Sequence, residues 1–199
     1  MSEKLEQLND AMASVVAHVR RSLVQVGNGS GGGAGTVWHA DGLVVTNAHV
    51  VRRGPVWVTL AAGRTLRARV LARDRYSDLA ALAVDAPDLP AIELGDSRQL
   101  RPGEWVFALG HPLGVRGGIT GGVVIGLGDD WTEGPLAGRE WLMVGLHLRP
   151  GHSGGPIFDA DGKMVGINTA MEGPDVGLAV PIHVAKAFLR DSLKLERAA

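Results

Sequence analysis

The first 21 residues carry apolar side chains at helical spacing. Apolar residues recur every three or four positions over residues 3–19, and charged or amide side chains occupy the opposite face. The apolar positions are Leu5, Leu8, Met12, Val15, Val16 and Val19. This pattern predicts a helix that packs either on its own domain or against a second copy of the chain.

From residue 22 the pattern changes to the alternation of β-strands. Short apolar runs recur roughly every ten residues between turn signals. Asp41-Gly42 and Asp161-Gly162 are typical hairpin turns, because glycine adopts a positive φ without strain. Strands are expected at 22–26, 36–38, 43–46, 56–60, 65–73, 80–84, 105–109, 119–126, 141–148, 156–158, 164–167 and 177–180. The pattern predicts an all-β sandwich or barrel.

Two further features of the pattern divide the chain. Pro102-Gly103 separates the strands into two similar sets, roughly residues 22–95 and 104–181. After Pro181, apolar side chains return to helical spacing, which predicts a C-terminal helix over residues 183–195. The 29 glycines among 199 residues agree with many tight turns between short strands.

Charge and cysteine content exclude several classes of function. The 20 Lys and Arg residues against 21 Asp and Glu leave a formal charge of −1. The chain lacks the excess of basic residues that binding to nucleic acid requires, so a nucleic-acid partner is not expected. The absence of cysteine excludes disulfides, thiolate zinc sites and a cysteine nucleophile. No apolar run is long enough for a membrane span, and the N-terminal residues do not form a secretory signal. We therefore expect a cytoplasmic protein.

Three short segments carry residues for nucleophilic catalysis. His49 lies within residues 46–51, Asp78 within 77–82 and Ser153 within 150–156, in the chain order of chymotrypsin-type proteases. A serine hydroxyl becomes a nucleophile when an imidazole removes its proton, and the imidazole needs a carboxylate to orient it. The conjunction of the three residues predicts a catalytic triad.

Glycines surround Ser153 on both sides. An oxyanion hole requires backbone N–H groups that converge on the developing negative charge, and we assign this role to Gly151 and Ser153. Gly154 and Gly155 have no side chains that could block the approach of a substrate carbonyl.

Seven segments together resemble the HtrA (high-temperature-requirement) family of trypsin-like serine proteases, over roughly residues 22–185. The matching segments are 43–51, 78–82, 94–97, 108–114, 151–156, 166–170 and 177–181. The resemblance implies a chymotrypsin/trypsin-like double six-stranded β-barrel with short terminal helices. Its expected parts are a helical segment at 1–21 and a protease domain at 22–199, with barrels at about 22–100 and 101–182.

The same resemblance implies roles for the site residues. His49 would be the general base, Asp78 its orienting carboxylate and Ser153 the nucleophile. Substrate would bind at Leu148, Asn168, Thr169 and Ala170, and the aliphatic side chains there favour a small or medium aliphatic P1 residue. The family resemblance further implies polypeptide substrates, protein quality control, no cofactor and a possible homotrimer built through the N-terminal region.

The sequence departs from the family at His111 and His152, where asparagine is usual. Two histidines in related positions raise the idea of zinc inhibition, although ordinary hydrogen bonding is favoured and no metal site is assigned. Residues 145–149 also differ from the usual approach to the serine. A catalytically silent peptide-binding protein on the same fold is therefore the main alternative.

Two other motifs have competing interpretations. Residues 151–155 match the G-x-S-x-G elbow of α/β-hydrolases, but Pro156 and a strand follow where a helix is needed, and only His183 lies downstream. Gly27, Gly29 and Gly32 match a dinucleotide-binding pattern, yet strands follow them in place of a helix. An esterase and a dinucleotide-binding protein are both disfavoured.

Overall fold

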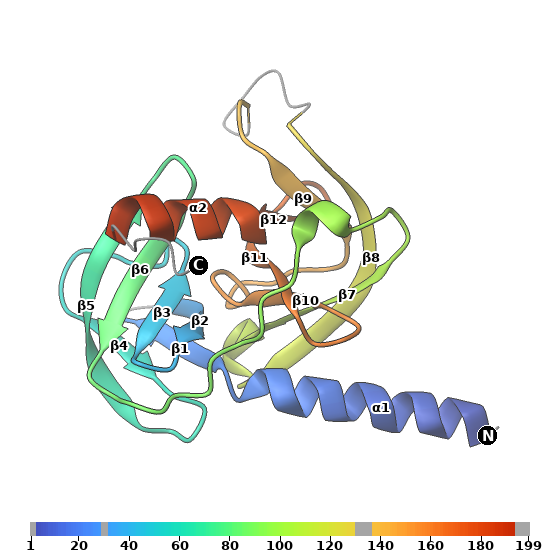
Figure 1. Cartoon of the computed structure of the whole chain (residues 1–199), viewed down its shortest axis with the longest axis horizontal. Coiled ribbons are helices and arrows are strands. Elements are labelled where there is room, and N and C mark those ends of the chain that lie inside the picture. Colours follow the sequence, from blue (N-terminus) through green and yellow to red (C-terminus); the bar gives the residue numbers. More distant parts are fainter. Residues whose placement is uncertain (1–2, 29–31, 130–136, 194–199) are drawn as a thin grey trace.

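Two closed antiparallel β-barrels lie side by side in the computed structural model, which describes residues 3–28, 32–129 and 137–193 (Figure 1). Each barrel consists of six strands, and one helix lies at either end of the chain. The predicted all-β fold with two six-stranded barrels is confirmed. Of the two architectures that the strand pattern allowed, the structure is a barrel and not a sandwich.

The first barrel is closed by the pairing of its first and fourth strands, with Val26 opposite Val58. Its strand order is β1-β2-β3-β6-β5-β4. Alternate side chains point inward, so Val24 and Val26 are buried while Gln25 between them is exposed. The strands are β1 (Leu23–Gly27), β2 (Gly32–His39), β3 (Leu43–Thr46), β4 (Val56–Thr59), β5 (Thr65–Asp74) and β6 (Leu79–Val84).

The second barrel repeats this arrangement with the order β10-β11-β12-β9-β8-β7 and closes where Ile157 pairs with Ala108. The predicted strand 141–148 ends earlier, at Gly145, because Leu146 and Leu148 turn into the barrel core without strand pairing. The strands are β7 (Trp105–Gly110), β8 (Gly118–Gly128), β9 (Trp141–Gly145), β10 (Pro156–Asp159), β11 (Met164–Met171) and β12 (Gly177–Pro181).

The C-terminal helix α2 (Ile182–Leu193) joins the two barrels, because it contacts β5 and β6 of the first and β11 and β12 of the second. Its apolar face, including Phe188 and Leu189, is buried in an apolar cluster that lies between the barrels. Each barrel also has its own core. Two short 3₁₀ turns, η1 (Ser97–Gln99) and η2 (Pro112–Gly114), complete the elements.

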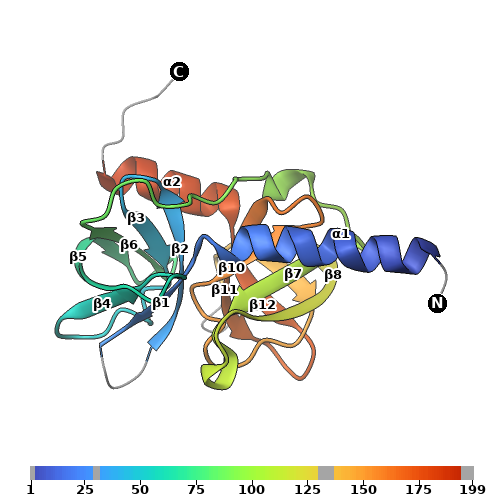
Figure 2. The same ribbon diagram turned by 90° about the horizontal axis from the view of Figure 1, so that it is seen from below.

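The N-terminal helix α1 (Glu3–Arg20) runs alongside the second barrel and projects past it (Figure 2). Val19 at its end is buried in the core between the barrels, whereas Leu5 and Leu8 are 51% and 57% exposed. The predicted helix is confirmed, and its apolar stripe is covered only toward the barrels. Neither helix in the described ranges is long and apolar enough to cross a lipid bilayer.

Parts of three sequence-based predictions lie outside the described residues. They are Gly29 of the disfavoured dinucleotide-binding pattern, residues 1–2 of the N-terminal segment, and residues 194–195 of the C-terminal helix.

Candidate active site

The three predicted catalytic residues follow or precede strands at the contact between the barrels. His49 follows β3 and Asp78 precedes β6, and these two strands pair in the first barrel. Ser153 precedes β10 in the second barrel. The Ser153 carbonyl accepts a hydrogen bond of 2.8 Å from the Ala34 N–H of β2, so the serine loop contacts the first barrel directly.

The Asp78 carboxylate holds His49 through two hydrogen bonds. The imidazole Nδ1 lies 2.7 Å from Oδ2, and the His49 backbone N–H donates to Oδ1 at 2.9 Å. The Asp78 side chain is 14% exposed and the His49 side chain is 49% exposed, so the ring faces solvent with its carboxylate partner behind it. Because Nδ1 donates to the carboxylate, Nε2 carries the lone pair that a general base requires.

Asp78 has a backbone φ of 53°, in the left-handed region that few residues other than glycine adopt. Its carbonyl accepts two bonds of 3.0 Å, from the Asn47 side chain and from the Ala48 N–H. The local strain is therefore offset by bonds from the segment that carries His49.

Asn47 connects the two barrels beside the triad. Its Nδ2 donates to the Asp78 carbonyl and, at 3.1 Å, to the Thr169 hydroxyl of β11. The sequence pattern alone assigns no role to Asn47. The one signal available was its place two residues before the histidine, next to the buried end of β3.

The Ser153 hydroxyl donates to the backbone carbonyl of Thr169 at 3.3 Å. Within the described residues no hydrogen bond joins it to His49. The neighbouring Gly154 has a φ of +85°, and a Cβ there would lie 2.2 Å from the Ala34 carbonyl and from the Thr46 hydroxyl. Only glycine permits the serine loop to approach the first barrel this closely.

The predicted oxyanion-hole donors are unpaired. Among the described residues, neither the Gly151 N–H nor the Ser153 N–H donates to a protein acceptor. The nearby carbonyls point elsewhere: Gly151 accepts from the His111 N–H at 2.8 Å, and Pro150 accepts from the Leu113 N–H at 3.1 Å. The two carbonyls are thus directed to the segment around η2, and within the described residues the two N–H groups have no protein acceptor.

Gly151 itself has a φ of +105°, and a Cβ there would lie 2.2 Å from the His111 carbonyl. A side chain at this position is therefore excluded both by backbone conformation and by space. The glycine fixes how close the loop before the serine lies to η2.

Both unusual histidines are largely buried, and each accepts a backbone N–H at Nδ1. The Arg149 N–H lies 3.0 Å from His152, and the Gly117 N–H lies 3.4 Å from His111. Burial holds the pKa of each imidazole below the usual histidine value. These contacts agree with the hydrogen-bonding interpretation, and no group of three metal-ligating side chains is found in the described part of the chain.

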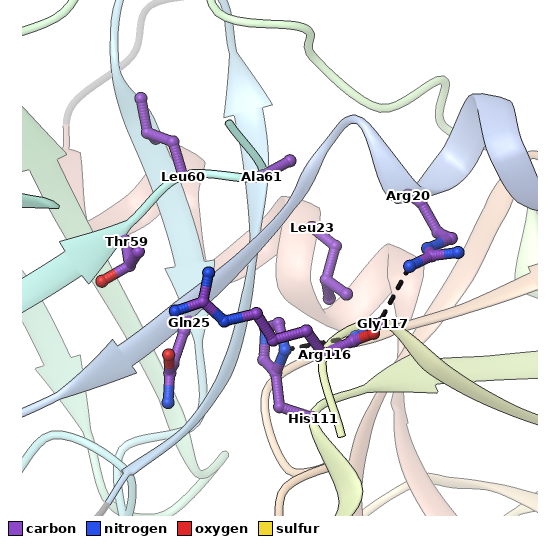
Figure 3. Close-up of a pocket in the computed structure, with 9 residues that line it drawn as sticks. All are labelled: Arg20, Leu23, Gln25, Thr59, Leu60, Ala61, His111, Arg116 and Gly117. Carbon is purple, nitrogen blue, oxygen red and sulfur yellow. Dashed lines mark hydrogen bonds between the residues drawn. The ribbon is translucent and has the colours of Figure 1, made fainter. Parts of the chain in front are cut away.

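A small pocket of about 70 Å³ lies beside His111, at the end of α1 (Figure 3). Arg20 donates from its guanidinium to the Arg116 carbonyl at 3.3 Å, and the Arg116 side chain extends past the His111 ring. None of the triad residues lines this pocket. Its connection to the candidate active site is the bond from the His111 N–H to Gly151.

The predicted substrate-binding residues differ in accessibility. The Asn168 side chain is fully buried and donates to the carbonyls of Leu109 and Pro156 at 3.2 Å each, so it is engaged inside the second barrel. Leu148 and Thr169 are 7% and 9% exposed, and Ala170 is partly exposed. Thr169 is the residue whose carbonyl contacts the Ser153 hydroxyl.

Comparison with known proteins gives one consistent result. The trypsin-like peptidase domain family matches residues 33–167. A putative serine protease named HhoB from Synechocystis is 38% identical over 161 residues, which cover 78% of this chain and 39% of that protein. A probable periplasmic serine endoprotease, DegP-like, from Halomonas elongata is 37% identical over 159 residues, covering 77% of this chain and 33% of that protein.

Solved structures agree. The HtrA-type protease AlgW with a decapeptide superimposes with a TM-score of 0.84 at 25% identity and covers 92% of this chain and 68% of that one. The chain thus spans between a third and two fifths of the two curated relatives named above. The predicted cytoplasmic location is wrong, because the DegP-like relatives from Halomonas and Brucella are named as periplasmic.

Proposed function

The chain belongs to the trypsin-like peptidase family, among the serine proteases of HtrA and DegP type, and from this we propose that it is a serine endopeptidase. The observation that carries the proposal is the pair formed by His49 and Asp78, in which both carboxylate oxygens accept bonds from one residue at 2.7 and 2.9 Å. A carboxylate that orients the imidazole in this way is what a general base requires.

The reaction begins with a rotation of the Ser153 hydroxyl from the Thr169 carbonyl toward His49 Nε2. Nε2 takes the hydroxyl proton while the oxygen attacks the scissile carbonyl carbon, and the resulting oxyanion accepts from the Gly151 and Ser153 N–H groups. The imidazolium then gives its proton to the leaving amine, which yields an acyl-enzyme. Water, deprotonated by His49, hydrolyses the ester and restores the serine.

We further propose that the substrate is an extended or unfolded polypeptide, in keeping with a role in protein quality control. Leu148 and Ala170 are aliphatic, and no acidic residue lies within residues 146–149. A small or medium aliphatic P1 side chain therefore fits better than lysine or arginine. Asn168 supports this wall from inside the barrel. Mass-spectrometric mapping of cut sites in casein tests the preference, and cuts mainly after basic residues would contradict it.

A fluorophosphonate probe tests the proposed chemistry directly, because it forms a covalent bond with an activated serine. We expect labelling of the wild-type chain and none of Ser153→Ala. Ser97→Ala is a matched control, because Ser97 is fully buried and contacts a different histidine. Casein degradation beside a stably folded substrate tests the preference for unfolded chains, and equal cleavage of both would overturn that part.

One observation favours a second function, that of a catalytically silent peptide-binding protein. The Ser153 hydroxyl contacts the Thr169 carbonyl and makes no hydrogen bond to His49 in the described structure. The fluorophosphonate experiment separates the two functions. Absence of labelling from pH 6 to 9, together with measurable peptide binding, would support the silent protein.

We also propose a homotrimer assembled through α1, and a periplasmic or otherwise exported location. The exposed Leu5 and Leu8 are the apolar surface that an assembly would cover. Light scattering of the 199-residue chain and of a variant that begins at Ser22 tests the assembly. We expect a trimer for the first and a smaller species for the second, and monomers for both would refute it.

A further inference from the structure

We propose that His152 is a positioning residue for the oxyanion hole, an inference that rests on the proposed protease function. In its neutral form the imidazole accepts the Arg149 N–H and closes the turn that ends at the nucleophile. That turn presents the N–H groups of Gly151 and Ser153 on either side of His152.

The geometry at Nδ1 determines which form of His152 the turn needs. A peptide N–H can only donate, so the 3.0 Å contact from Arg149 requires a lone pair on Nδ1. The Arg149 carbonyl, which already accepts the His152 backbone N–H at 3.0 Å, lies 3.2 Å from the same ring nitrogen. Side chain and backbone of His152 therefore both bind Arg149, and together they define the turn.

The surroundings of the ring disfavour its protonated form. His152 is 2% exposed, and Nε2 is buried without a partner within the described structure. Burial lowers the pKa of His152, the hydrogen bond to the Arg149 backbone opposes this shift in part, and the charges of Arg149 and His111 lower the pKa further. The charges of Arg116 and Arg20 in turn lower the pKa of His111. A proton on His152 is thus unfavourable near neutral pH.

Protonation would exchange the hydrogen bonds of the turn. An Nδ1–H would donate to the Arg149 carbonyl, and the Arg149 N–H would lose its acceptor. The strand behind the loop leaves little room for adjustment, because a Cβ on Gly110 would lie 2.5 Å from the His152 Cα and 2.7 Å from the Gly151 carbonyl. Protonation therefore removes the bond from the Arg149 N–H that closes the turn, and we expect the donors of the oxyanion hole to be held less firmly.

The test is the pH dependence of fluorophosphonate inactivation between pH 4.5 and 8.5, a reaction that uses both His49 and the oxyanion hole. Three variants are compared with wild type. His152→Asn retains an acceptor and does not titrate, and His152→Leu has no acceptor. His39→Gln removes an exposed histidine at the end of β2 and serves as the control.

For wild type we expect the logarithm of the inactivation rate to fall more steeply at the acid end than for His152→Asn, because the turn of wild type requires a neutral His152. His152→Asn should have the shallower acid slope and react at pH 8 within about threefold of wild type. His152→Leu should react about tenfold to hundredfold more slowly at pH 8, because an oxyanion donor is worth about 10²–10³ in rate.

An acid slope that is the same for His152→Asn and wild type would overturn the proposal, as would a folded His152→Leu that reacts at the wild-type rate. Circular dichroism at each pH establishes that the variants are folded. If His152→Leu does not fold, the slope of His152→Asn decides. A wild-type chain that never reacts with the probe would refute the protease function, whereas a reactive chain with unchanged slopes would refute only the role of His152.

Discussion

Among the described residues, two carboxylate–histidine–serine arrays differ in whether one nitrogen of the histidine has no partner. In the first, Asp78 holds His49 at 2.7 Å and the Ser153 hydroxyl is bonded elsewhere. In the second, Glu140 lies 2.8 Å from His183 Nε2, and Ser97 lies 2.8 Å from its Nδ1. The second histidine has a partner at each ring nitrogen, whereas the first has one nitrogen available.

Burial separates the two arrays further. The His183 side chain is 13% exposed and Ser97 is fully buried, while the His49 side chain is 49% exposed. No substrate carbonyl can reach a fully buried hydroxyl. The second array instead ties η1, the start of β9 and the start of α2 together. Residue types alone therefore do not identify a catalytic array, because exposure and an unsatisfied nitrogen are also required.

The largest difference is expected from removing each serine hydroxyl. Ser153→Ala should reduce peptide hydrolysis on the order of 10⁴-fold to 10⁶-fold without loss of stability, because it removes the nucleophile. Ser97→Ala should leave kcat unchanged and lower the free energy of unfolding by about 1–3 kcal/mol, because it leaves Nδ1 of His183 without a partner. Casein hydrolysis and urea unfolding measure the two effects. Equal loss of activity in both variants would contradict the distinction.

The carboxylates give the next effect. Asp78→Asn should lower kcat about 10⁴-fold, because an amide no longer stabilises the imidazolium, and asparagine tolerates the left-handed backbone at this position. Glu140→Gln should lower the free energy of unfolding by about 1 kcal/mol, because it weakens a partly exposed hydrogen bond to His183. It should leave kcat within twofold, because Glu140 does not contact the first array. A rate of Asp78→Asn within tenfold of wild type would show that the carboxylate does not assist catalysis.

Asn47 tests whether the first array depends on the contact between the barrels. Asn47→Ala removes the bonds to the Asp78 carbonyl and to Thr169. We expect about a tenfold loss of kcat and about 1–3 kcal/mol less stability, because buried acceptors lose their donor. The second array, which shares none of these atoms, provides the reference. A stability loss with unchanged kcat would assign Asn47 to the fold alone.

The smallest effect concerns pH and the buried histidines near the first array. Burial lowers the pKa of His111 and His152, so the unfolded chain binds protons at a higher pH than the folded protein. The stability that the two neutral histidines contribute should therefore be fully present above about pH 6.5. As the pH drops toward the pKa values of the folded state, the free energy of unfolding should fall by at most about 1.4 kcal/mol per pH unit for each histidine. Thermal unfolding of wild type and His111→Asn measures this, and identical acid profiles would contradict it.

Local pattern was sufficient to predict most of the fold. The alternation over residues 105–109 corresponds to β7, because every second side chain enters a barrel core, and the spacing over residues 3–19 corresponds to α1. The strand expected at 141–148 was too long, because Leu146 and Leu148 continue the apolar pattern after pairing has ended. Pairing depends on a neighbouring strand, which local pattern does not contain.

The candidate site was predicted in composition but not in geometry. His49, Asp78 and Ser153 were identified from their segments, and His49 and Asp78 do lie together. The Ser153 rotamer, the contact of Asn47 with Thr169 and the bond from the Leu113 N–H to the Pro150 carbonyl depend on residues distant in sequence. The roles assigned to site residues, and the division at residue 21, stay predictions.

The contact of Gly154 with Ala34 and Thr46 has a consequence for the timing of activity during synthesis. The nucleophile loop takes its shape from two halves of the polypeptide, and its hydroxyl is held by a carbonyl that lies 16 residues further on. A nascent chain that has completed only its first half therefore contains a base without an alcohol to activate. On the proposed mechanism, hydrolytic activity would therefore require both halves to be synthesised and docked.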